Sequence, residues 1–252
     1  MPKYKGLFKG KEGSIGDVTF AKTKDGYQMR EKNEVSAQAI ATAPSYQRTR
    51  ENMAEFGRAG KAGKLLRHAL RTLLLNTKDR LVSSRLTKAM MEVIKSDTVN
   101  GRGLRTVTDG DVQLLEGFDF NANAGLTTTL YALYSATIDR ATGVMTLEVP
   151  SMVPTQELVA PIGTTHYQIV CGGAAVDFAG ESFTADIKQS PYLPWTAATA
   201  PLLNLTANVP AASTHPLFFA AGVLFFQEVN GSYYALKSGE HNALGLVKVT
   251  AD

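Results

Sequence analysis

The sequence predicts an α+β protein in which an N-terminal arm or hairpin and two helices precede an antiparallel β-sandwich of immunoglobulin-like or fibronectin-like architecture. Apolar residues recur at helical spacing between residues 49 and 96. From about residue 112 this periodicity disappears, and short apolar runs alternate with turn residues. We therefore expect a basic arm and β-hairpin over 1–44, a helical segment with a linker over 45–111, and the sandwich domain over 112–252.

The N-terminal segment is expected to form an arm followed by a hairpin. Residues 1–12 are basic and glycine-rich, and a hairpin is expected over 14–32 because Asp25-Gly26 is a favourable tight-turn pair. A two-stranded hairpin is marginal in water, so its apolar residues should contact another surface, of this chain or of a partner. Residues 33–44 are small and polar and end at Pro44, a helix stop or entry. The apolar hairpin residues are Ile15, Val18, Phe20, Tyr27 and Met29.

A long helical pattern follows over 49–76, with a start near Ser45 or Thr49. Either side chain can accept a hydrogen bond from a free N–H group of the first turn. Three glycines, each costing about 1 kcal/mol relative to alanine in a helix interior, fall inside the pattern. Close backbone packing or a break into two helices would explain them, and we favour close packing. These glycines are Gly57, Gly60 and Gly63.

A second helix is predicted over 79–96 from a clear apolar stripe that includes Leu86 and Met90. Asp79 stands near its start and Lys95 near its end, where each charge suits the helix dipole. The following residues, 97–111, are interpreted as linker-like because they contain two turn pairs that end in glycine.

The C-terminal part is expected to hold eight short strands. The strongest hairpin signal is Asn230-Gly231, and Gly172-Gly173 is interpreted as another turn. An immunoglobulin Cys…Trp…Cys pattern is absent, since Cys171 is the one cysteine, so the likeness is one of architecture. The predicted strands are Ala136–Asp139, Val144–Val149, His166–Cys171, Ser182–Lys188, Leu202–Val209, Leu217–Val229, Ser232–Leu236 and Gly245–Val249.

The charge is divided along the chain. Residues 1–105 carry 22 Lys and Arg against 10 Asp and Glu, whereas residues 106–252 carry 4 against 13. The net charges are therefore +12 and −9. The basic part could bind nucleic acid or another polyanion, dock on the acidic part of the same chain, or dock on that of a neighbour. A solvated basic face without a partner remains open as well.

The basic residues are concentrated on the first predicted helix. A phosphate-binding loop is excluded there, because five residues rather than four separate Gly57 from Gly63 and no Ser or Thr follows Lys64. Neither a base-reading motif nor an aromatic stacking platform accompanies the charges. Solvation, intrachain salt bridges, a protein contact and a polyanion contact all remain open. The candidate contact residues are Arg58, Lys61, Lys64, Arg67 and Arg71.

The sequence predicts no catalytic, metal or cofactor site. The four histidines are scattered without metal-ligand spacing, and no Gly-x-Ser-x-Gly elbow is present. We therefore expect a protein that is not an enzyme. With no secretory signal and no long apolar run, we expect cytoplasmic synthesis and no membrane span, with an extracellular or virion-like particle as an alternative destination.

Several of these features occur together in a known sequence pattern. The Gly13–Phe20 stretch, the Arg48-Thr49-Arg50 segment and the Glu55–Arg67 helix resemble uncharacterised bacterial families of the Bacteroidetes type. The resemblance covers about residues 6–70. It implies no function and no site residues, but the layout is similar to that of structural subunits that self-assemble.

The leading hypothesis is a structural subunit that self-assembles into a homo-oligomer, filament, tube or phage-like particle. The N-terminal arm and basic-to-acidic contacts between copies would hold the assembly together. The first alternative is a nucleic-acid or polyanion binder without sequence preference. The second is a carbohydrate- or surface-binding module with an aromatic platform built from Tyr192, Trp195, Tyr233 and Tyr234.

Overall fold

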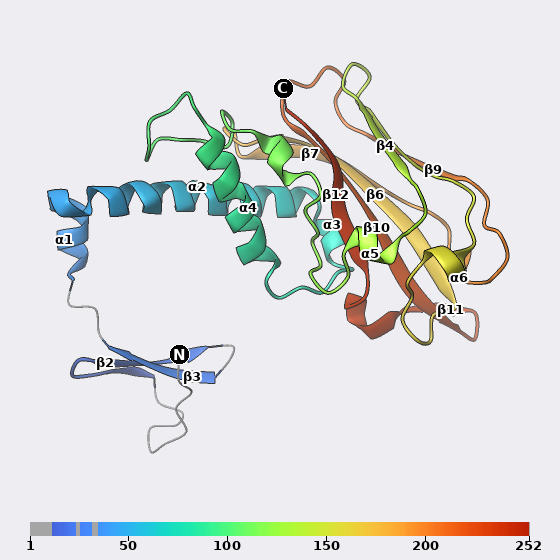
Figure 1. The fold of residues 1–252 in the computed structure, drawn as a ribbon, viewed down its shortest axis with the longest axis horizontal. Coiled ribbons are helices and arrows are strands. Elements are labelled where there is room, and N and C mark those ends of the chain that lie inside the picture. Colours follow the sequence, from blue (N-terminus) through green and yellow to red (C-terminus); the bar gives the residue numbers. More distant parts are fainter. Residues whose placement is uncertain (1–11, 24–25, 32–34, 252) are drawn as a thin grey trace. The chain divides into compact units, whose positions relative to one another are not determined.

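The computed structural model describes residues 12–23, 26–31 and 35–251. The chain divides into two compact units, Met1–Glu51 and Asn52–Asp252 (Figure 1). The helices that precede residue 111 share a hydrophobic core with the sheet that follows it.

The first unit contains a small antiparallel sheet of order β1-β2-β3. Its strands are β1 Gly13–Ile15, β2 Val18–Thr23 and β3 Gly26–Glu31. The predicted hairpin is confirmed as β2 and β3, and β1 is an additional strand that the sequence did not indicate. Gly16, with φ of 58°, makes the turn between β1 and β2. Asp25 of the predicted turn and the basic arm at residues 1–11 lie outside the described residues.

Two short helical elements follow this sheet. Helix α1 spans Ala37–Thr42, where only small polar residues had been noted, and it is capped by the Ser36 hydroxyl, which accepts from the Ala39 N–H at 3.1 Å. The 3₁₀ turn η1 spans Pro44–Tyr46. Pro44 stands at its first position, where the missing N–H costs no hydrogen bond, so this proline acts as a helix entry.

Helix α2 spans Gln47–Ala69 and runs without a break through all three glycines. The expected close packing holds for Gly63 alone, where an added Cβ would lie 3.5 Å from Cγ of Leu86. At Gly57 and Gly60 an added Cβ would meet nothing within 4 Å, so close packing inside the chain does not explain these two residues.

The helical pattern predicted over 49–76 ends earlier than expected. Leu70 leaves the α-helical conformation, with ψ of 18°, and a short helix α3 spans Arg71–Leu74. Helix α4 then spans Val82–Ser96 and starts three residues later than predicted. Asp79 lies before it, where the carboxylate accepts from the Leu81 N–H at 2.6 Å.

The β-rich part forms two sheets. Its strands are β4 Ser135–Asp139, β5 Val144–Val149, β6 His166–Asp177, β7 Ser182–Gln189, β8 Leu193–Pro194, β9 Leu203–Asn208, β10 Leu217–Val229, β11 Ser232–Ala235 and β12 Ala243–Thr250. The larger sheet has the order β11-β10-β6-β7, with β12 on β10 and β8 on β6, and the smaller sheet has the order β4-β5-β9. All strand pairs are antiparallel, so the α+β class is confirmed. Short helical turns between and beside them are η2 Val112–Leu115, α5 Leu126–Thr129, α6 Pro154–Glu157 and η3 Leu236–Gly239.

The turn predicted at Gly172-Gly173 is wrong, because β6 continues through both glycines. Their role is to admit close neighbours on opposite faces of the sheet. A Cβ on Gly172 would lie 2.8 Å from Leu73 Cδ1, and one on Gly173 would lie 2.6 Å from Met145 Sδ. The absence of side chains here lets a helix approach one face and the small sheet approach the other.

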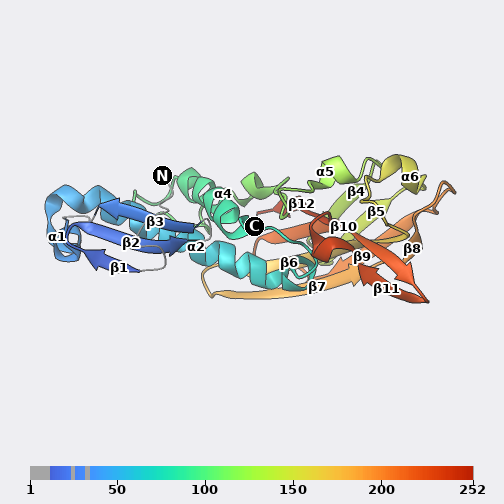
Figure 2. The same ribbon diagram turned by 90° about the horizontal axis from the view of Figure 1, so that it is seen from below.

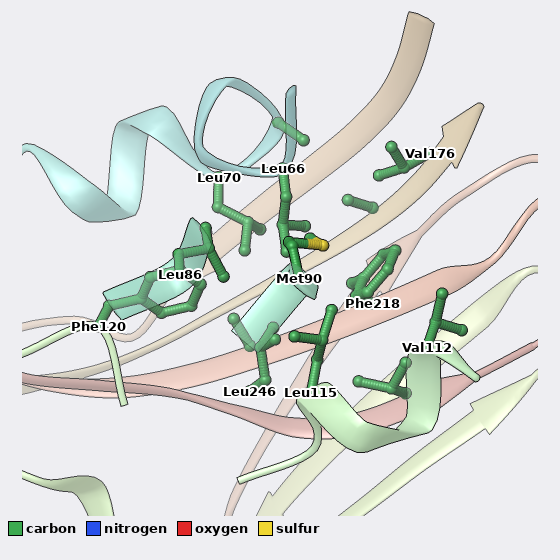
Figure 3. Close-up of a cluster of buried hydrophobic side chains, with 14 of the residues drawn as sticks. Leu66, Leu70, Leu86, Met90, Val112, Leu115, Phe120, Val176, Phe218 and Leu246 are labelled. Atoms are coloured by element: carbon green, nitrogen blue, oxygen red, sulfur yellow. The ribbon is translucent and has the colours of Figure 1, made fainter. Parts of the chain in front are cut away.

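The large sheet is buried on both faces, so the second unit has three layers (Figures 1 and 2). Alternation along β10 sends Phe218 towards α2 and α4, and Phe219 towards β5 and β9. Figure 3 shows the first of these cores, where Leu66 of α2 and Leu70 just after it lie near Met90 of α4 and Phe218 of the sheet. The helices are thereby fixed against a rigid sheet, and their outer faces are presented to solvent.

Candidate functional site

The register of the first unit brings the predicted apolar residues onto one face of its sheet. In an antiparallel pair, directly opposed residues share a face, as do residues two apart along a strand. Ile15 pairs with Val18, and Phe20 pairs with Met29. Tyr27 lies two residues before Met29 and joins the same face. All five residues predicted from the sequence therefore meet on one surface drawn from three strands, which we call the arm face.

Among the described residues, the two hydrophobic cores include no member of the arm face. Ile15 is 58% exposed and Met29 is 46% exposed, and none of the described residues between 12 and 51 is fully buried. The opposite face of the sheet carries polar residues such as Ser14, Thr19 and Gln28. Apolar side chains are thus gathered on the arm face, and burying them against another surface would be favourable.

A second feature is a row of basic side chains along α2 and α3. Lys61, Lys64, His68 and Arg71 follow one another at intervals of three or four residues, and all four are exposed. This spacing places Lys61, Lys64 and His68 on one side of α2, and Arg71 follows at the start of α3. We call them the cationic stripe. Its outer position follows from the packing of Leu66 and the other buried residues of α2 on the opposite side.

The other two predicted basic residues are used inside the structure. Arg58 donates from Nε to the Arg105 carbonyl at 2.7 Å, and a second guanidinium nitrogen donates to the Gly103 carbonyl. Arg67 donates from Nε to the Gly63 carbonyl at 3.3 Å, one turn back along the helix. Both are half-buried. Both guanidinium groups therefore hydrogen-bond to backbone carbonyls of the chain itself.

The segment 97–111 is a fixed loop rather than the linker that the sequence indicated. Glu55 of α2 is 1% exposed, and its carboxylate accepts from the Gly103 N–H at 2.7 Å and from two guanidinium nitrogens of Arg105 at 2.8 Å each. The hydrogen bond from Arg105 lowers the pKa of Glu55 more than burial raises it. The loop is therefore tied to α2 by a buried, ionised pair.

Asp97 fixes the other end of this loop. Its carboxylate accepts from the backbone N–H groups of Val99, Asn100 and Thr106 and from the Asn100 side chain, all within 3.0 Å. Burial raises the pKa of Asp97, but these donors outweigh it and lower the pKa to about 2. The sequence did not indicate the role of Glu55, because its partners Gly103 and Arg105 lie about fifty residues away in a loop that only the fold brings to α2.

A cleft lies between the cationic stripe, this loop and the turn after β6. Its volume is about 560 Å³. Leu65, Val107 and Phe178 supply apolar walls, and Lys61, Lys64 and His68 bring the stripe to its edge. Phe178 is half-buried and packs edge-to-face on Phe218, with ring centroids 5.9 Å apart. The cleft therefore combines a cationic rim with an aromatic wall.

The stripe is poorly neutralised by the chain itself. In the described part of the second unit, one ion pair joins the basic part of the sequence to the acidic part, between Lys61 Nζ and Glu181 Oε1 at 3.5 Å. Both side chains are largely exposed, and such pairs contribute about 0–1 kcal/mol. Among the described residues, the alternative in which the basic helix docks on the acidic part of the same chain is thus represented by the Lys61 pair alone.

The acidic side chains of the C-terminal part mostly serve local backbone groups. At least seven of them accept hydrogen bonds from backbone N–H groups of nearby loops and strands. Such bonds satisfy donors that no strand or helix partner reaches. These seven are Asp111, Glu116, Asp119, Asp139, Glu157, Asp177 and Asp186.

The four residues of the predicted aromatic platform are only partly brought together. Tyr192 and Tyr233 stack with ring centroids 3.9 Å apart, and His166 packs edge-to-face on Tyr233 at 4.9 Å. The stack covers one face of each tyrosine ring. Trp195 is half-buried against the core between the sheets, and Tyr234 follows Tyr233 and so points to the opposite side of β11. The cluster therefore leaves little flat aromatic surface for a sugar ring.

No protein family, curated protein or solved structure was found to match this chain. Over the residues that the structure describes, no group of three or more His, Cys, Asp or Glu side chains has the geometry of a metal site. None of the described helices is long and apolar enough to cross a membrane. The arm face and the cationic stripe with its cleft are accordingly the two surfaces from which a function can be argued.

Proposed function

We propose that this protein is a structural subunit that associates with copies of itself through the arm face, to build a homo-oligomer, filament, tube or phage-like particle. The observation that carries the proposal is the arm face itself. Five apolar side chains of one small sheet share a surface, yet none of them is fully buried within the chain.

Burial energetics support a partner for this surface. Fully burying a Val, Ile, Met or Phe side chain contributes about 1.5–3 kcal/mol relative to leaving it exposed. Ile15 and Met29 are about half exposed, so each would gain roughly 1 kcal/mol on being covered. Val18 and Tyr27, which are half-buried, would add their own remaining exposed area. A second copy presents the same apolar residues, so two arm faces can cover each other.

The β-rich part would serve as the body of the subunit. The core between the large and small sheets supports a sandwich-like arrangement of immunoglobulin-like or fibronectin-like kind, on which an arm can be carried. In this proposal the arm face makes the contact between copies, and the second unit forms most of the mass of the particle.

The test compares the mass of the full chain with that of two double variants. Size-exclusion chromatography with light scattering should give a wild-type mass several times 27.1 kDa that rises with protein concentration. Ile15→Lys with Met29→Lys should reduce the mass to that of one chain. A matched variant, Ser14→Lys with Gln28→Lys, adds the same charge to the polar face of the same sheet and should still assemble.

Two results would contradict the proposal. A wild-type chain that stays at 27.1 kDa at all concentrations has no self-association to explain. Equal loss of mass in both double variants would show that added charge, rather than loss of the arm face, is responsible.

A further inference from the structure

We propose that the cationic stripe and the cleft beside it bind single-stranded nucleic acid, with the phosphates along the stripe and a base against Phe178. The proposal concerns the second unit and does not depend on the arm face. The charge of the stripe, its length and the aromatic wall of the cleft all suit a phosphodiester strand.

Charge is the first argument. Lys64 and Arg71 are exposed and take part in no ion pair among the residues that the structure describes, and Lys61 meets only the exposed Glu181. The nearby acids Glu55 and Asp97 are committed to the 97–111 loop. The stripe therefore keeps its positive charge available for a polyanion.

Length is the second argument. The stripe spans ten residue-to-residue steps from Lys61 to Arg71, which corresponds to roughly 15 Å at a helical rise of 1.5 Å per residue. A stacked strand carries one charge per about 3.4 Å, so roughly four phosphates fit along the stripe. A single carboxylate or a free phosphate would use only one of its cations.

The cleft supplies the third argument. A cavity of about 560 Å³ lies directly beside three members of the stripe and has an aromatic ring in its wall. Base stacking on an aromatic side chain tolerates any sequence, because every base presents a π-face. Leu65 and Val107 give the cleft further apolar surface. Among the described residues that line the cleft, none is Asn or Gln, and the basic side chains at its rim suit phosphates, so binding without sequence preference is expected.

The rigidity of the surroundings adds to this argument. The 97–111 wall is held by Glu55 and Asp97, and α2 is held by its buried side against the large sheet. A site formed on fixed elements loses little entropy when a ligand orders it.

The experiment measures fluorescence polarisation of a labelled mixed-sequence single-stranded DNA of about 20 nucleotides on the full chain. If three phosphates are neutralised, log affinity should fall against log salt with a slope of about −2, which is an approximately 20-fold loss between about 50 and 200 mM NaCl. Lys64→Glu with Arg71→Glu should weaken binding at low salt at least about tenfold and bring the slope closer to zero than about −1.

Matched controls separate this site from general charge. Lys88→Glu with Lys95→Glu changes the net charge by the same amount on α4, and binding should stay within about twofold of wild type. Phe178→Leu keeps an apolar side chain against Phe218 but removes the ring. It should weaken single-strand binding about fivefold or more while leaving the salt slope unchanged. Circular dichroism checks that each variant keeps the wild-type fold.

Three results would overturn the proposal. The first is a flat salt dependence in the wild type. The second is equal weakening in the α4 control, which would assign binding to net charge. The third is a duplex of the same length that binds as tightly as the single strand and is unaffected by Phe178→Leu, which would leave the cleft without a role.

Discussion

Replacing Asp97 by asparagine tests whether an ionised carboxylate holds the loop that forms one wall of the cleft. Asp97 is 4% exposed, and each of its carboxylate oxygens accepts two hydrogen bonds. In Asp97→Asn one oxygen becomes an NH₂ group, which faces donors and accepts from none. Each of the two abandoned donors costs about 1–3 kcal/mol. We expect the free energy of unfolding at pH 7 to fall by about 3 kcal/mol.

The loss of stability in Asp97→Asn relative to wild type should depend on pH. The pKa of Asp97 is lowered from 3.8 to about 2 in the folded chain, so its ionised form favours folding by about 2 kcal/mol at neutral pH. This contribution is present above the unfolded pKa and is lost as the pH falls towards the folded pKa. The asparagine variant has no such group to protonate. Its deficit relative to wild type should therefore shrink by about 1 kcal/mol between pH 7 and pH 3.

Urea denaturation at both pH values, followed by circular dichroism, measures these differences. The matched control is Glu92→Gln, an exposed carboxylate paired only with Lys95 on the surface of α4, which should change stability by less than about 0.5 kcal/mol. A deficit below about 1 kcal/mol at pH 7, or the same deficit at pH 7 and pH 3, would refute the account of this loop.

Three further outcomes follow from the packing. Alanine at Gly57 or Gly60 should raise the free energy of unfolding by about 0.5–1 kcal/mol each, because α2 is continuous there and the added methyl meets open space; denaturation that shows a loss would refute this. Gly222→Ala should lower it by about 2–3 kcal/mol, since the methyl would lie 2.4 Å from the Ala243 carbonyl, and unchanged stability would contradict that geometry. Burial raises the pKa of the Cys171 thiol to about 12, so a disulfide reagent at pH 8 should react with it only on unfolding, whereas prompt reaction would place the thiol at the surface.

Local patterns were sufficient to predict most strands. The bounds predicted for Val144–Val149 and Leu217–Val229 coincide with β5 and β10, because each run ends at a turn whose geometry is encoded by adjacent residues. The Asn230-Gly231 turn is confirmed, with φ of 52° and 78° at its two residues. Where the determinants are neighbours in sequence, periodicity and turn chemistry carry the prediction.

The failures have their determinants far away in sequence. Gly172 and Gly173 suggest a turn until Leu73 and Met145 are known to need the space of a missing side chain. The predicted linker at 97–111 is another case, since its partner Glu55 lies about fifty residues earlier. Glycine pairs and polar loops are ambiguous in one sequence, because the same residues serve a turn or a close approach.

For the two candidate surfaces, too, the local features could be predicted from the sequence and the long-range contacts could not. The arm face could be predicted in part, since alternation within a hairpin indicates that Val18 and Phe20 share one face of the sheet and that Tyr27 and Met29 share one face. The place of Ile15 could not, because it depends on the additional strand β1 and its pairing with β2. The stripe could be predicted only in part. Helical spacing indicates that Lys64 and Arg71 share a side, but nothing local reveals that Arg58 is occupied by the carbonyls of Gly103 and Arg105. The cleft wall contributed by Phe178 also depends on the contact between distant elements.

The two proposed contacts should respond to salt in opposite directions. Burial of the arm face is an apolar contact, which sulfate strengthens because it is excluded from protein surfaces. Contacts between the stripe and phosphates release counterions and weaken steeply as salt rises. If the particle mass increases in ammonium sulfate while DNA binding decreases in sodium chloride, two separate surfaces are at work. If self-association and DNA binding both decline together with salt, the copies are held by basic-to-acidic contacts between neighbours. In that case the stripe, rather than the arm face, is the interface.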